Sequence, residues 1–201
     1  MVNGNRHIED KVQEVVSGVT TTKLTVVTPV IKTWAATETV SKSATGCHAS
    51  ITALTTVQTI TDGITQPTTC RNVTITTAKG GVSNMSGDVV VTGTNIWGQT
   101  ITDTLAEGAD GLVAGTKAFK TITSILVPVR VQESDAITVG YGDTLGVDVF
   151  LPNTSCCIKQ TKDGTADTLP TVSCDADEIE KNTILCATAL NAQVMIAYFL
   201  I

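Results

Sequence analysis

The side chains best suited to catalysis are few and far apart in this sequence. It contains two histidines, His7 and His48. A histidine, a thiol and a carboxylate such as His48, Cys186 and Asp175 could form a nucleophilic triad, because imidazole activates a thiol that it hydrogen-bonds. The local signatures that accompany such triads do not surround these residues. We therefore expect a protein that is not an enzyme.

The cysteines favour packing over chemistry. An even number of them would suit a disulfide framework in a secreted chain, and no two show the spacing of a zinc or redox motif. We interpret them as reduced thiols that act as small apolar core residues. A bridge between Cys174 and Cys186, or between Cys156 and Cys174, is the alternative. The six cysteines are Cys47, Cys70, Cys156, Cys157, Cys174 and Cys186.

Two further segments could bind ions. Asp175, Asp177 and Glu178 offer the carboxylate oxygens that Ca²⁺ prefers, but they lack the glycine and the distal glutamate of an EF-hand loop, so we interpret them as a solvated acidic turn. Residues 140–143, Gly-Tyr-Gly-Asp, lack the Gly-Lys-Thr/Ser ending of a phosphate-binding loop and are interpreted as a turn. We expect neither a metal nor another cofactor.

The elements that must position these residues are strands. The chain has 201 residues, 37 of them threonines, which alternate with Val and Ile between Thr20 and Tyr141. Such β-branched residues favour a pleated surface. A hydrophobic content of 42% with 3% aromatics suits two sheets that interdigitate medium-sized side chains. We predict an all-β fold, an antiparallel β-sandwich of jelly-roll or Ig-like type, with a short N-terminal helix or arm.

Residues 7–17 have the pattern of a short amphipathic helix. Ile8, Val12, Val15 and Val16 recur on one face, and Gly18 is a natural stop. Because about three turns are marginal in isolation, this segment must dock, either on its own domain or on a neighbouring subunit. We predict a helical arm over 1–18, a leading β segment over 19–66 and the main sandwich over 67–201; one continuous domain over 19–201 is the alternative.

Alternation bounded by turn residues predicts the individual strands. We expect them at 71–77, 88–94, 100–105, 117–128, 136–141 and 145–151. In the tail, the polar residues 160–170 predict an exposed loop and residues 175–182 predict one helical turn. The apolar stretch 193–201 predicts a strand added to a sheet of this chain or of a neighbour.

Charge and hydropathy limit the kinds of partner that the protein could bind. A net charge of −6 and a pI near 4.8 argue against nucleic acid, which requires clustered Lys and Arg. No apolar run approaches the roughly 20 residues of a membrane helix. The first residues lack the order of a signal peptide, so we expect synthesis in the cytoplasm.

Some residues are candidates for contacts with a protein partner. Trp97 lies near the tip of a predicted hairpin, where it either folds back into the core or anchors an interface, since Trp is enriched at binding hot spots. Lys117 and Lys120 flank Phe119, a predicted core residue, and could meet an acidic partner or solvent. The predicted partner interface comprises Arg6, Ile8, Val12, Val15, Trp97, Lys117 and Lys120.

A series of motifs runs between residues 60 and 152: Ile64–Pro67 followed by Arg71–Thr74, then Gly87–Asp103, Gly115–Ile125 and Thr138–Gly146. In their order and spacing, these motifs resemble a family of phage and prophage virion structural proteins. Cys70, before Arg71, and Val147, after Gly146, depart from the family's pattern.

The resemblance implies a non-enzymatic virion component, a capsid decoration (cement) protein on the capsid exterior. Its partners would be the major capsid protein and copies of itself, as a trimer or alternatively a dimer, with assembly in the host cytoplasm. The competing interpretation is a tail-associated or fibre-type virion protein involved in host attachment. A bacterial adhesin module is a third, for which an export signal would be needed.

Overall fold

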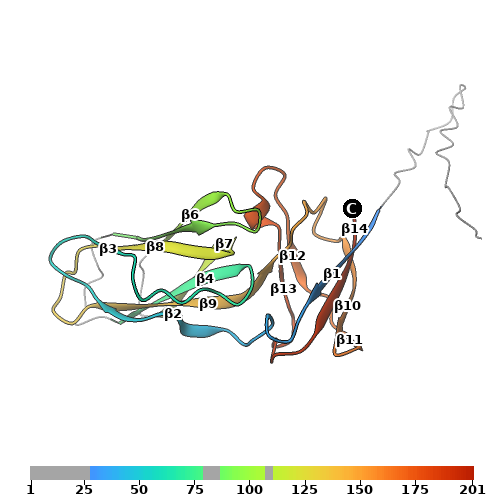
Figure 1. Ribbon diagram of the computed structural model, residues 1–201, viewed down its shortest axis with the longest axis horizontal. Helices are drawn as coiled ribbons and strands as arrows, with labels where there is room; N and C mark the ends of the chain where they lie inside the picture. The colour runs from blue at the N-terminus through green and yellow to red at the C-terminus, as the bar shows by residue number, and fades with distance from the viewer. Residues whose placement is uncertain (1–27, 79–86, 107–110) are drawn as a thin grey trace, which may run out of the picture.

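The computed structural model describes residues 28–78, 87–106 and 111–201. The predicted arm over 1–18, with Arg6, Ile8, Val12 and Val15, lies outside the described residues. The predicted fold class is confirmed: the described chain is nearly all β, in antiparallel sheets that pack on one another. The molecule is elongated, with a two-sheet body at one end and a third sheet at the other (Figure 1).

The described residues form three sheets. The central sheet has the order β12 (Thr171–Ser173), β13 (Thr183–Leu185), β9 (Ala136–Gly146), β4 (Arg71–Ala78) and β7 (Gly111–Phe119), with β2 (Ser43–Thr52) also paired to β9. The upper sheet has the order β3 (Gln58–Ile60), β8 (Thr121–Val127), β5 (Val89–Thr94) and β6 (Thr100–Leu105). The terminal sheet has the order β1 (Pro29–Trp34), β14 (Met195–Leu200), β10 (Cys157–Lys162) and β11 (Thr165–Asp167).

The first hydrophobic core lies between the central and upper sheets. Strands β5 and β6 alternate strictly between buried and more exposed residues, as expected when one sheet face meets the core. Val73 and Ile75 from β4 meet Val91 and Ile125 across the gap, and all four are fully buried. Phe119 belongs to this core, as predicted.

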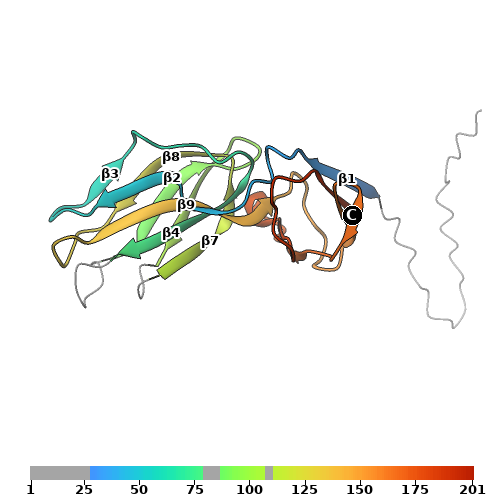
Figure 2. The same cartoon turned by 90° about the horizontal axis from the view of Figure 1, so that it is seen from below.

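A second core lies between the terminal sheet and the end of the central sheet. Trp34, Met195 and Phe199 fill it from the terminal sheet, and Leu145 and Ile184 from the central sheet. Strand β9 therefore reaches both cores, because its Ile137 and Val139 belong to the first one. Figure 2 shows β9 running from the body toward the terminal sheet.

The described part of the predicted leading segment contributes to every sheet. Strand β1 pairs with β14, β2 with β9 and β3 with β8. The N-terminal strand β1 is therefore hydrogen-bonded to the C-terminal strand β14, and the predicted addition of residues 193–201 to a sheet occurs within this chain.

Several predicted elements need correction. The strand expected over 117–128 is two strands, because the chain leaves the central sheet at Phe119 and enters the upper sheet at Thr121. The turn expected over 140–143 is a continuation of β9, in which glycines permit close approach of neighbouring chain. The strand expected over 145–151 ends at Gly146.

The loop expected over 160–170 contains β10 and β11. Its first polar residues are buried with partners: Gln160 donates to Asp167 at 2.8 Å, and Lys162 donates to the carbonyl oxygens of Thr188 and Ala189, whereas Asp163, Thr165 and Thr168 are exposed. Because the buried residues here are polar, the sequence lacks the alternation of apolar and polar residues that would predict a strand. The helical turn expected in 175–182 is a 3₁₀ turn, η1 (Ile179–Lys181).

Candidate interaction surface

The motifs of the sequence analysis meet around Asn72 of β4. Residues 115–117 bulge from β7 between the pairs Asn72–Ala118 and Thr74–Ala114. Residues 142–144 bulge from β9 between the pairs Arg71–Leu145 and Val73–Tyr141. The buried Asn72 amide serves both bulges, since Nδ2 donates to the Gly115 carbonyl and Oδ1 accepts from the Thr144 N–H, each at 3.2 Å.

Asp103 of β6 completes this network from the other sheet. Its Oδ2 accepts from the N–H groups of Thr116 and Lys117 at 3.0 and 3.3 Å. These are the donors that the bulge in β7 withdraws from the strand ladder. One carboxylate therefore ties the upper sheet to the central sheet, and its role is structural.

Arg71 is fully buried beside the same network. Its Nε donates to the Gly142 carbonyl at 2.7 Å and its Nη1 to the Val40 carbonyl at 2.9 Å. Asp143 lies 3.5 Å from Nη2, and the guanidinium covers the Tyr141 ring at 4.4 Å. Burial lowers the pKa of Arg71, while Asp143 and Tyr141 oppose that effect. Its donors are used to hold β4, β9 and the 35–42 connection together.

The residues considered for catalysis have separate partners. The His48 Nδ1 contacts the Ala49 carbonyl, and Cys186 packs in the second core against Met195. Asp175 accepts the N–H groups of Asp177 and Glu178, both at 2.9 Å. Within residues 28–78, 87–106 and 111–201, no cluster of three or more His, Cys, Asp or Glu side chains could hold a metal ion. In the same residues no helix is long and apolar enough to cross a membrane.

All six cysteines lie in the described residues and are unpaired. Five are buried and Cys174 is exposed. Burial raises the pKa of the Cys47 and Cys70 thiols to about 12. Buried thiols of this kind are poor nucleophiles, because the thiolate is the reactive form.

Trp97 is held at the tip of the β5–β6 hairpin by Asn95. The Asn95 Oδ1 accepts from the N–H groups of Trp97 and Gln99, both at 3.0 Å. The Asn95 Nδ2 donates to Glu180 at 3.2 Å, which fastens the tip to η1. Trp97 is still 50% exposed, so it does not fold back into the core.

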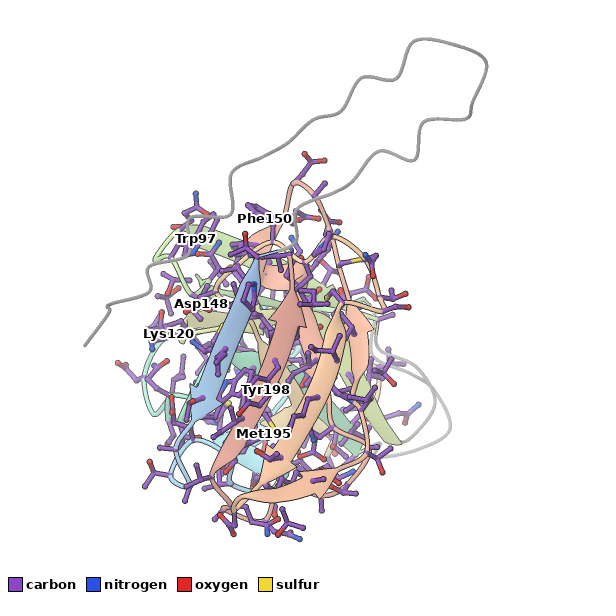
Figure 3. All side chains as sticks on the ribbon, turned by 90° about the vertical axis from the view of Figure 1, so that its right-hand side faces the viewer. Trp97, Lys120, Asp148, Phe150, Met195 and Tyr198 are labelled. Carbon is purple, nitrogen blue, oxygen red and sulfur yellow. The ribbon has the colours of Figure 1, made fainter. Side chains whose placement is uncertain are left out.

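Phe150 is the partner that the sequence analysis missed. Its ring meets Trp97 edge to face, with centroids 5.3 Å apart, and it is 39% exposed. The Trp97 Nε1 donates to the Asp148 carbonyl at 3.3 Å, and the Asp148 carboxylate pairs with Lys32 of β1 at 2.9 Å. Figure 3 shows Trp97 and Phe150 near one another in the upper part of the view.

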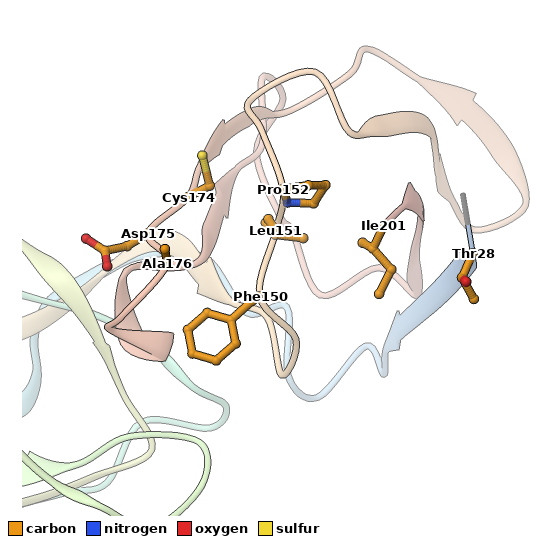
Figure 4. Close-up of a pocket in the computed structure, with 8 residues that line it drawn as sticks. All are labelled: Thr28, Phe150, Leu151, Pro152, Cys174, Asp175, Ala176 and Ile201. Carbon is orange, nitrogen blue, oxygen red and sulfur yellow. The ribbon is translucent and has the colours of Figure 1, made fainter. Parts of the chain in front are cut away.

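An apolar cleft adjoins this aromatic pair. Phe150, Leu151 and Pro152 line one side, and Ile201 and Thr28 lie across from them (Figure 4). Cys174, Asp175 and Ala176 complete the lining, and the volume is about 780 Å³. We call Trp97, Phe150 and this cleft the aromatic surface.

The two predicted lysines behave differently. Lys117 is paired within the chain, at 2.6 Å from Glu178 and 3.3 Å from Glu180. Lys120 is exposed between β7 and β8, and its backbone N–H donates to the Thr94 carbonyl. Of the two, Lys120 keeps its side chain accessible to a partner.

The fold and this surface define an all-β sandwich protein with a rigid, exposed aromatic pair. Comparison of the chain with family models, with curated proteins and with solved structures finds no match.

Proposed function

We propose that this chain is a non-enzymatic capsid decoration (cement) protein of a phage virion. It binds the outside of the shell and bridges major capsid subunits, as the motif resemblance implies. It works as a homo-oligomer, a trimer or a dimer, without nucleic acid, membrane or cofactor. The observation that carries the proposal is the Trp97–Phe150 pair, a large exposed apolar contact on a rigid scaffold.

The energetics of interfaces support this role for the aromatic surface. Aromatic anchors dominate binding energy when they are held in place beforehand, because little conformational entropy is lost on binding. Trp97 meets that condition through Asn95, Phe150 and Asp148. Many copies in a symmetric shell would strengthen even a modest contact through avidity.

The distribution of polar groups supports a structural role. Arg71, Asn72 and Asp103 are buried and bind backbone groups across strands. Such networks rigidify a fold when every member is satisfied. A stiff body is what a bridging protein requires.

The test is co-sedimentation of the purified protein with shells of the major capsid protein. Trp97→Ala should weaken binding by about 10-fold or more, the range of a hot-spot residue. Leu169→Ala is the matched control, since Leu169 is also exposed and apolar but lies after β11. Equal binding by wild type and Trp97→Ala, with both folded, would remove the aromatic surface from the proposal.

The number of copies per particle distinguishes a decoration protein from the alternative, a tail-associated or fibre-type protein. A decoration protein should occur in purified particles in numbers near those of the capsid subunit, and a tail protein in far fewer. Of the two tryptophans, Trp34 is fully buried in the second core, which leaves Trp97 as the exposed one and gives less support to a receptor-binding tip.

A further inference from the structure

The outer face of the terminal sheet is apolar and uncovered by the described residues. Met195, Ala197 and Phe199 of β14 point into the second core, so Ile196, Tyr198 and Leu200 point the other way. On β1 the residues opposite them are Thr33, Ile31 and Pro29. Figure 3 looks onto this face, with Tyr198 labelled. We call these six residues the outer face.

The exposed face of an antiparallel sheet is usually polar, whereas this one is apolar. Ile31 is 60% exposed, and Ile196, Tyr198 and Leu200 are half-buried. An apolar sheet face is stable when another layer covers it. A positive charge lies beside this face, because Lys159 of β10 places its Nζ 5.2 Å from the centre of the Tyr198 ring. A fitting cover is therefore apolar on one side and carries acidic groups near Lys159.

We propose that residues 8–16 of the same chain cover the outer face. Ile8, Val12, Val15 and Val16 supply the apolar side that the periodicity predicts. Glu9, Asp10 and Glu14 supply the acidic groups. The proposal is independent of the virion role, since it concerns how the chain completes its own fold.

The dimensions agree with this assignment. Nine helical residues span roughly 14 Å at about 1.5 Å per residue, which fits within a six-residue strand such as β14 of roughly 20 Å. Apolar residues three and four positions apart give the stripe that a helix packs on a sheet.

The short length of chain between residue 16 and β1 favours docking of the chain's own segment over docking of the same segment from a second copy. Thr28 pairs with Ile201 through two backbone hydrogen bonds, at 2.6 and 2.9 Å, so the chain enters the sheet beside the outer face. The twelve residues from Val16 to Thr28 reach at most about 40 Å. A tether this short holds the segment at millimolar effective concentration, well above micromolar protein.

A pair of engineered thiols tests the placement in the full chain. In a Cys174→Ser background, Val12→Cys combined with Tyr198→Cys should form a disulfide within one chain under mild oxidation. Val12→Cys combined with Leu112→Cys is the matched control, because Leu112 is exposed but lies on β7 of the central sheet. Absence of the first link, or equal yields of both, would overturn the proposal. A linked dimer would assign the segment to a second copy and also overturn it.

Hydrogen exchange gives a second readout that needs no new thiol. Amides of residues 8–16 should exchange at least about 10-fold more slowly than in an unfolded peptide, which corresponds to about 1.4 kcal/mol of local stability. Ile31→Glu should abolish that protection while the strands stay protected, and Leu112→Glu should leave it unchanged. Protection that survives Ile31→Glu, or that is missing in the wild type, would contradict docking on this face.

Discussion

The Arg71 guanidinium donates from Nε to the carbonyl of Gly142 at 2.7 Å, inside the protein and across two strands of the central sheet. This bond joins two sequence motifs that are 71 residues apart. It explains the arginine chemically, because a bulged strand presents a carbonyl that the regular ladder does not pair. The motif that looked like a turn is thus one side of a buried structural network.

Arg71→Met should destabilise the fold strongly. The Gly142 and Val40 carbonyls would each lose a buried donor, and Asp143 would lose its ion pair with Arg71. We expect a loss of about 3 kcal/mol in the free energy of unfolding, measured by urea denaturation.

The matched control is Lys42→Met, which removes the other cation near Asp143. Lys42 lies 3.9 Å from that carboxylate and is mostly exposed, so its loss should cost less than about 1 kcal/mol. If both variants lost a similar free energy of unfolding, the buried hydrogen bonds of Arg71 would contribute no more to stability than an exposed ion pair.

Gly140→Ala should be more damaging than Gly98→Ala. A Cβ at Gly140 would overlap the Ser43 carbonyl and the backbone of Ala44, whereas at Gly98 it would meet nothing and only the φ of +80° is unfavourable. We expect a loss of about 2 kcal/mol or more at Gly140 from overpacking and about 1 kcal/mol at Gly98. Thermal or urea unfolding of both variants checks the order, and the reverse order would contradict the close approach of β2 and β9.

Stability should fall in acid, partly through Glu178. Its hydrogen bonds with Lys117 and Lys181 lower the pKa of Glu178 below its ordinary value of 4.5. The folded state then binds this proton less readily than the unfolded state. The contribution of Glu178 is present in full above the ordinary pKa and is lost as the pH drops through the lowered one.

The measurement is the melting temperature between about pH 7 and pH 3. Glu178→Gln should melt lower than wild type near neutral pH and should lose less stability on acidification. Asp62→Asn, at an exposed turn, should follow the wild-type curve. A Glu178→Gln profile parallel to that of wild type would show that these hydrogen bonds do not affect stability.

Thiol labelling should distinguish Cys174 from the other cysteines. At about pH 8, DTNB should react with one thiol per native chain, because Cys174 is exposed and burial raises the pKa of Cys47, Cys70 and Cys186. Denaturant should release all six thiols. Cys174→Ser should bring native labelling close to zero, and rapid labelling of that variant would place another thiol at the surface.

Local patterns predicted those elements whose burial alternates along the strand. Residues 88–94 and 100–105 follow the expected period and form β5 and β6. The prediction was wrong where glycine or buried polar residues interrupt that pattern. Gly140 and Gly142 serve close packing in β9, and Gln160 and Lys162 are buried through hydrogen bonds to Asp167 and Thr188.

The aromatic surface was predictable only in part. Trp97 stood out because an aromatic at a hairpin tip has no local reason to be there. Phe150 carried no such signal, since it lies in an apolar stretch and reaches Trp97 only after β9 has crossed from one core to the other. The sequence suggested that Lys117 could contact a partner, but in the fold it forms ion pairs with Glu178 and Glu180.

The amino-acid sequence by itself determined the all-β class and the alternation of the body strands, because both follow from the residue types at successive positions. It also determined the net charge of −6 and the presence of only two histidines. Tertiary structure alone decided that β1 pairs with β14, that the motifs around Arg71 and Gly142 form one network, and that Trp97 meets Phe150. These relationships depend on contacts between residues distant in the chain, and local periodicity contains no information about which distant segments meet.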